Sequence, residues 1–223
     1  MDEDKTEPQA ADATDPDTTD DPISHVRSRV VPSGALRARE QREPRLVQAR
    51  RTCAALVASA SNPPLRLQAE FDLVGIGRLR TTLLTNFALS DDASVADGAF
   101  LLSFDYRGRE PLVYGCASEA VYKALSRRLF DHGLEVRGAT SALASKLVIE
   151  ARVPASVRFE ADRARERMRL TLHNVAMLGT TTYDLPLEAA DRALLDALVG
   201  LVTGQSREFY TLTARAGLGR RRG

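Results

Sequence analysis

The sequence has no tryptophan, and only two cysteines and three histidines among its 223 residues. Cys53 and Cys116 lie far apart without a CxxC partner, so we predict neither a disulfide framework nor a zinc knuckle. The histidines also lack the spacing of metal ligands, and we expect neither a metal nor a cofactor. The scarcity of aromatic residues argues against a platform on which single-stranded nucleic acid stacks.

Long apolar runs are absent as well. No segment approaches the roughly 18 apolar residues that a membrane-spanning helix needs. The acidic first residues lack the basic and apolar regions of a signal peptide. We therefore expect no membrane span and a cytoplasmic location.

The net charge is only +1, but acidic and basic residues are segregated along the chain. Residues 1–24 carry nine acids and one lysine, whereas residues 25–51 carry eight arginines and two glutamates. This composition predicts a disordered tail over 1–44, acidic and then basic, and a basic C-terminal tail over 213–223. Solvated tails are the favoured interpretation, and contact with nucleic acid through these arginines is left open.

Between the tails, hydrophobic periodicity predicts one α+β domain over 45–212 with mainly antiparallel strands and hairpins. Helices are expected at about 45–61, 118–132 and 187–203. A division into two halves, 45–137 and 146–212, remains an alternative. The last helix carries a long apolar stripe from Leu187 to Val202, and Gly204 is its expected stop.

Two local predictions concern the middle of the chain. Strands over 100–106 and 111–116 flank Arg107-Gly108-Arg109-Glu110, a sequence typical of a hairpin turn. In the helix that follows, Ser118 is the expected N-cap. The buried stripe of this helix is predicted to consist of Val121, Ala124, Leu125 and Leu129.

Familiar catalytic signatures are missing from the sequence. GIGRLR at 75–80 begins like a dinucleotide-binding turn, but Arg80 stands at the third glycine position and a strand follows where a helix is required. There is no Walker sequence, no HExxH and no GxSxG. No catalytic residues are therefore predicted, and an unrecognised enzyme is the least favoured class.

The most distinctive stretch is Thr171–Pro186, TLHNVAMLGTTTYDLP. Within it, Asn174 to Gly179 fits the spacing Asp-or-Asn, x, Ser-or-Ala, x, x, Gly, and Arg163/Arg167 and Arg165/Arg169 each form an Arg-x-x-x-Arg pair. This combination resembles the PilZ domains, the receptors for cyclic di-GMP. The resemblance covers about twenty residues and implies a nucleotide site, for which the candidate residues are Arg158, Arg163, Arg165, Arg167, Arg169, Asn174 and Gly179.

A second interpretation of the same stretch concerns folding alone. Asn174 tolerates a turn conformation, Gly179 supplies a positive φ, and Met177 and Leu178 belong to the core. Arg167 and Arg169 then project outward together, with Glu160 across a hairpin as their internal partner. Three hypotheses result: a bacterial-type binding or adaptor module that contacts a protein partner, a sensor of a nucleotide or another anionic ligand, and an unrecognised enzyme.

Overall fold

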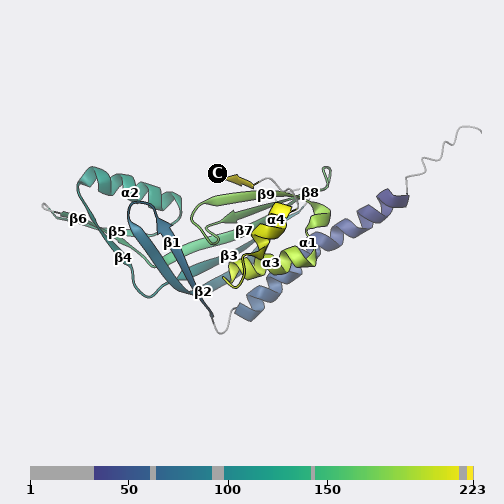
Figure 1. Ribbon diagram of the computed structural model, residues 1–223, viewed down its shortest axis with the longest axis horizontal. Helices are drawn as coiled ribbons and strands as arrows, with labels where there is room; N and C mark the ends of the chain where they lie inside the picture. Colours follow the sequence, from purple (N-terminus) through teal and green to yellow (C-terminus); the bar gives the residue numbers. More distant parts are fainter. Residues whose placement is uncertain (1–32, 61–63, 92–97, 142–143, 216–219, 223) are drawn as a thin grey trace, which may run out of the picture.

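The computed structural model describes residues 33–60, 64–91, 98–141, 144–215 and 220–222, which form an α+β fold with two antiparallel sheets (Figure 1). The larger sheet has seven strands in the order β1-β2-β3-β7-β8-β9-β10. These strands are β1 (Leu65–Leu73), β2 (Gly77–Asp91), β3 (Ala99–Arg107), β7 (Arg152–Asp162), β8 (Arg167–His173), β9 (Thr180–Pro186) and β10 (Arg220–Arg222). The predicted fold class is confirmed.

A smaller sheet and one helix are inserted between β3 and β7. We call residues 112–149 the inserted lobe. It comprises β4 (Leu112–Cys116), α2 (Glu119–Asp131), β5 (Val136–Ser141) and β6 (Ala144–Ile149), with strand order β4-β6-β5. Because β4 pairs with β6, a domain boundary between residues 137 and 146 would separate two hydrogen-bonded strands.

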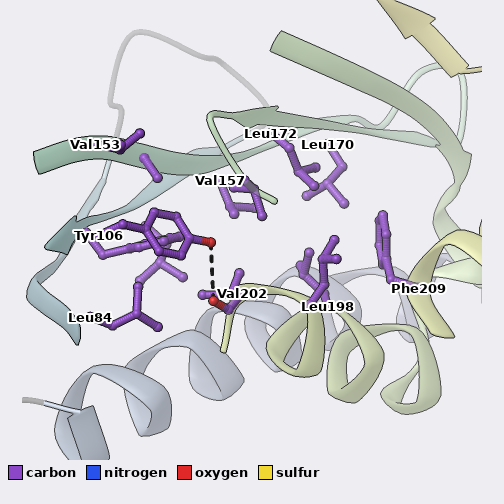
Figure 2. Close-up of a cluster of buried hydrophobic side chains, with 14 of the residues drawn as sticks. Leu84, Tyr106, Val153, Val157, Leu170, Leu172, Leu198, Val202 and Phe209 are labelled. Carbon is purple, nitrogen blue, oxygen red and sulfur yellow. Dashed lines mark hydrogen bonds between the residues drawn. The ribbon is translucent and has the colours of Figure 1, made fainter. Parts of the chain in front are cut away.

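Three helices cover one face of the large sheet: α1 (Ser33–Ala60), α3 (Arg192–Val202) and α4 (Glu208–Arg215) (Figure 1). Figure 2 shows the core between the two layers, where Leu198, Val202 and Phe209 face side chains from the strands. The strands supply these side chains by strict alternation, since every second residue of β7 and β8 is buried. Val157, Leu170 and Leu172 therefore point toward the helices, and the intervening polar residues form the outer face.

The sequence explains both ends of α3. Asp191 is the N-cap, and its side chain accepts a hydrogen bond from the backbone N–H of Leu194 at 2.9 Å. Gly204 adopts a positive φ of 70° directly after the helix, as predicted. The buried stripe is also confirmed, since it includes Leu194, Leu195, Leu198, Leu201 and Val202. The helix begins at Arg192 rather than at Leu187, because Leu187–Ala189 form a 3₁₀ turn.

The boundaries differ from the predictions at both ends of the domain. α1 begins at Ser33 and continues through Pro44, so part of the expected tail is helical; the rest of that tail, 1–32, lies outside the described residues. At the other end, α4 was not predicted, and Arg220–Arg222 pair with β9 instead of forming a free tail.

Two predictions about the inserted lobe are wrong. β3 and β4 do not form a hairpin around 107–110: β3 pairs with β2 and β7, whereas Leu112 and Tyr114 of β4 pair with Ile149 and Leu147 of β6. In α2 only Leu129 of the expected stripe is buried, and Val121 and Ala124 are exposed. The hydrophobic periodicity correctly identified the apolar face of α2, but no element of the described structure covers that face over the first two turns of this helix.

We predict that Leu195→Ala lowers the free energy of unfolding by about 2–5 kcal/mol, because it leaves a cavity in the layer between α3 and the sheet. Chemical denaturation monitored by circular dichroism measures this change. The control is Asp196→Ala on the exposed side of the same helix, whose 3.5 Å ion pair with Arg192 contributes little. Equal, small effects of both substitutions would contradict the core position of Leu195.

Candidate functional site

The turn from Asn174 to Gly179 has an unusual backbone. Asn174 and Ala176 have positive φ angles of 52° and 61°, and Gly179 has a φ of 102°. The backbone N–H of Asn174 donates to the carbonyl of Gly179 at 2.8 Å, and the N–H of Gly179 donates to Asn174 Oδ1 at 2.9 Å. The predicted roles of Asn174 and Gly179 in the turn are therefore confirmed.

Asn174 also joins this turn to two distant parts of the chain. Its side chain is fully buried, and Nδ2 donates to the carbonyl oxygens of His132 and Pro154, each at 2.8 Å. His132 ends α2 and Pro154 lies on β7, so one amide holds the inserted lobe, the large sheet and the turn together. Since Oδ1 and Nδ2 are both used inside the protein, this side chain is not presented to a ligand.

A buried tyrosine supports the same turn from the core. Tyr106 Oη donates to the carbonyl of Val202 at 3.3 Å (Figure 2) and accepts a hydrogen bond from the backbone N–H of Ala176. Burial raises the pKa of Tyr106, so its hydroxyl remains protonated and donates. The end of α3 and the turn are thus connected through one hydroxyl group.

His173 precedes the turn, and each of its ring nitrogens lies close to a polar side-chain atom. Nε2 lies 3.1 Å from Asn174 Nδ2, and Nδ1 lies 3.1 Å from Thr180 Oγ1. Because Nε2 faces an NH₂ group, we assign the hydrogen to Nδ1, which donates to Thr180. Burial lowers the pKa of His173, and the nearby His132 lowers it further. The two hydrogens of Asn174 Nδ2 already go to the carbonyls of His132 and Pro154, so Nε2 lies against the amide without a full hydrogen bond from it.

The turn lines a hollow that we call the turn cleft, with a volume of about 280 Å³. Its walls come from the β1–β2 connection, from α2 and from the turn, although β1 and β8 are separated by three strands in the sheet. The large sheet therefore coils enough to bring these segments together. The lining residues are Glu70, Asp72, Leu73, Val74, Ile76, Leu125, Arg128, Leu129, His132, Ala176, Met177 and Leu178.

The cleft also corrects a prediction about the turn. Met177 was expected in the core, but 39% of its surface is exposed, and Leu178 is only partly buried. The apolar residue that the turn does bury is Val175. Positive φ angles at Asn174 and Ala176 break the strand alternation, so alternation could not assign the inward side chain here.

The candidate arginines lie on the outer face of the sheet and at its far end. Arg163 and Arg165 are exposed in the β7–β8 turn. Arg167 Nε is 3.0 Å from Asp184 Oδ1, and Arg158 Nε is 3.0 Å from Glu160 Oε1. Arg169 is exposed, opposite Glu160 and Asp184 in the strand register. Arg167 and Arg169 thus project outward as predicted, but the carboxylate that pairs with Arg167 is Asp184 rather than Glu160.

The structure does not bring all candidate residues together. β8 runs from Arg167 to His173, so its two ends are about 20 Å apart at the rise of a β-strand. Arg163, Arg165 and Arg167 lie at one end, and Asn174 and Gly179 lie beyond the other. The resemblance in sequence placed these residues within one motif, but an extended strand separates them.

The charged residues closest to the turn were not singled out by the sequence. Arg128 and His132 lie one helical turn apart at the end of α2, and Asp72 comes from β1. The only local signal was the i, i+4 spacing of two basic residues at the end of a helix, which is also common without function. Their proximity to residues 176–178 follows from the tertiary fold.

Known proteins do not extend this description: no protein-family model, no curated protein and no solved structure matches the chain. Within the part of the chain that the structure describes, no group of three or more His, Cys, Asp or Glu side chains is arranged to hold a metal ion. Among the same residues, no helix is long and apolar enough to cross a membrane.

We predict that Asn174→Gly lowers the free energy of unfolding by about 3 kcal/mol or more. Glycine accepts the positive φ, so the loss isolates the side-chain hydrogen bonds, and each buried group left without a partner costs about 1–3 kcal/mol. We expect Ala176→Gly, in contrast, to raise the free energy of unfolding by up to about 1 kcal/mol, because glycine adopts the positive φ at this position without strain. Urea denaturation distinguishes the two, and equal effects would contradict this role of Asn174.

A pH dependence follows from His173. Its folded pKa lies below the unfolded value of about 6.5, so its contribution to stability is complete above that pH and is lost as the pH falls through the folded pKa. We expect the free energy of unfolding to decrease between about pH 7.5 and pH 5.5, and to decrease less in His173→Gln. Parallel pH profiles of the two proteins in urea denaturation would rule out His173 as the source.

Proposed function

We propose that this chain is a non-catalytic, cytoplasmic binding module that contacts a protein partner through the turn cleft. The observation that carries the proposal is the pair of apolar side chains in the lining of the cleft that remain in contact with solvent. Val74 is 62% exposed and Met177 is 39% exposed, although both border an apolar hollow. Exposed apolar surface around a recess is typical of interaction sites.

The size of the cleft favours a partner's side chain over a whole small molecule. Its volume of about 280 Å³ is at the lower end of the roughly 300–1,000 Å³ of typical ligand pockets. Protein interfaces commonly place one or two large side chains into recesses of this kind, and those anchors supply most of the binding energy. Leu73, Leu125 and Leu129 would surround such an anchor with apolar contacts.

Charged groups in the cleft provide the specificity of the proposed contact. Glu70 is paired with Arg78 and Arg80, at 3.5 and 3.0 Å. Asp72 and Arg128, by contrast, form no ion pair with any residue that the structure describes. Two unpaired groups of opposite sign would orient a bound segment that carries complementary charges.

The test is affinity capture with the intact protein, followed by crosslinking and identification of the captured partner. We expect Val74→Glu and Met177→Glu each to lower the recovery of the partner at least about tenfold, because a buried, unpaired carboxylate is costly at an interface. The matched control is Val113→Glu on β4, a valine that is 59% exposed and does not line the cleft. Unchanged recovery in the cleft variants, or an equal loss in the control, would contradict the proposal.

A second candidate function is a PilZ-like sensor of a nucleotide such as cyclic di-GMP. It is supported by Arg169, which is exposed and makes no ion pair with any described residue, beside Arg158 and Arg167 on the same sheet face. A guanidinium in this position can bind phosphate oxygens in a bidentate manner. This candidate site lies along the outer face of β7 and β8 and does not use the side chain of Asn174.

Titration calorimetry with cyclic di-GMP tests the sensor. If the site exists, Arg167→Ala/Arg169→Ala weakens binding by at least about tenfold, because charge-assisted hydrogen bonds are lost. Arg192→Ala removes an exposed arginine from α3 and should leave the affinity unchanged. Absence of heat and of any thermal shift with a panel of nucleotides would reject the sensor and leave the protein-binding proposal intact.

A further inference from the structure

A second hollow lies on the other side of α2, away from the turn cleft, and has a volume of about 650 Å³. We call it the aromatic hollow. Four residues of α2 line it together with the α2–β5 connection and the start of β5. Its lining comprises Tyr122, Ser126, Arg127, Phe130, Gly133, Leu134, Glu135, Val136 and Arg137. This volume is within the roughly 300–1,000 Å³ range of small-molecule sites.

Two aromatic rings stand in its lining. Phe130 is 77% exposed, the largest exposure among the large hydrophobic side chains that the structure describes. Tyr122 lies two helical turns earlier and packs closely over Gly138, where a side chain would collide with the tyrosine ring. Glycine at this position therefore allows Tyr122 to lie against β5, and the two rings offer apolar faces to a planar group.

The charges of the aromatic hollow leave one positive group unpaired. Glu135 Oε1 is 2.6 Å from Arg152 Nη1, and Arg137 Nε is 3.1 Å from Glu150 Oε1. Arg127 is exposed and makes no ion pair with any described residue. After the internal pairs are formed, the hollow therefore presents a single guanidinium, which favours an anion.

Ser126 lies in the lining of the aromatic hollow and carries an unsatisfied hydroxyl group. Its Oγ is buried and has no hydrogen-bond partner among the described residues. Buried hydroxyl groups nearly always have a partner, and leaving one without costs free energy. Ser126 lies between Tyr122 and Phe130 on the same side of α2, but its Oγ is closed off from the hollow, so a ligand there would not reach it in this conformation.

We propose that the aromatic hollow binds a small molecule with a planar aromatic ring and an anionic group, a phosphate or a carboxylate. The ring lies against Phe130 and Tyr122, and the anion pairs with Arg127. Both nucleoside monophosphates and simple aryl phosphates have this chemistry. The site shares no lining residue with the turn cleft, so it is independent of the protein contact proposed above.

The fluorescent probe 1-anilinonaphthalene-8-sulfonate, an aromatic anion, tests the proposal with the full-length protein. We expect one saturable site whose affinity falls on the order of tenfold in Phe130→Ala and in Arg127→Ala, because each loses one of the two main contacts. Met177→Ala, in the other hollow, should bind the probe as the wild type does. Phe130 and Arg127 are exposed, so neither substitution is expected to unfold the protein, and circular dichroism confirms this for each variant.

Displacement of the probe then identifies the ligand class. Phenyl phosphate should displace it, whereas benzyl alcohol, which has the ring without the charge, should not. Stronger displacement by adenosine monophosphate indicates a nucleotide, and stronger displacement by phenyl phosphate indicates a simple aryl acid; either result supports the site. Absence of saturable binding, equal affinity in all variants, or equal displacement by the charged and neutral compounds would overturn the proposal.

Discussion

The fold depends on the buried amide of Asn174 more than on any other single polar group described. Its three hydrogen bonds to the backbone reach the end of α2, β7 and its own turn, three segments that are far apart in the sequence. A buried amide with all its bonds made fixes positions in a way that apolar packing alone does not. The turn cleft exists in its observed shape because this group holds α2 and the turn at a defined distance from each other.

Residue type and hydrophobic periodicity predicted the parts of the fold that depend only on neighbouring residues in the sequence. The alternation along β8 placed Arg167 and Arg169 on the outer face, and the stripe and stop of α3 followed from the leucines and Gly204, whereas the Asp191 cap was missed and the helix was expected to begin at Leu187. The partner of β4 was not predictable in the same way, because strands over 100–106 and 111–116 have equally good patterns whether they pair with each other or with distant strands. For α2, periodicity showed an apolar face, but whether another element covers that face is a property of the whole chain.

In the candidate site, too, the sequence predicted local features but not which residues lie close together in space. The positive φ angles at Asn174 and Gly179 and the outward direction of Arg167 and Arg169 followed from residue type and period. Spacing along the chain, however, is not distance in space: a strand between Arg167 and Asn174 separates residues that a short motif groups together. Conversely, Arg128 of α2 and Asp72 of β1 both line the turn cleft although 56 positions separate them, a proximity that follows from the tertiary fold.

The position of the inserted lobe has an evolutionary consequence. Arg107 and Arg152 are register partners on adjacent strands, and Gly108 donates to Ala151 at 2.7 Å, so the two ends of the intervening chain meet. A single deletion at this point, closed by a tight turn, would preserve the strand order of the large sheet, and a single acquisition would restore the lobe. Such a lobeless ancestor or descendant would lack the His132 carbonyl, so one of the three hydrogen bonds that the Asn174 side chain makes to the backbone would be lost and the constraint on residue 174 would weaken. If the lobe was gained or lost in this way, related sequences with the lobe should have asparagine at position 174 more often than sequences without it.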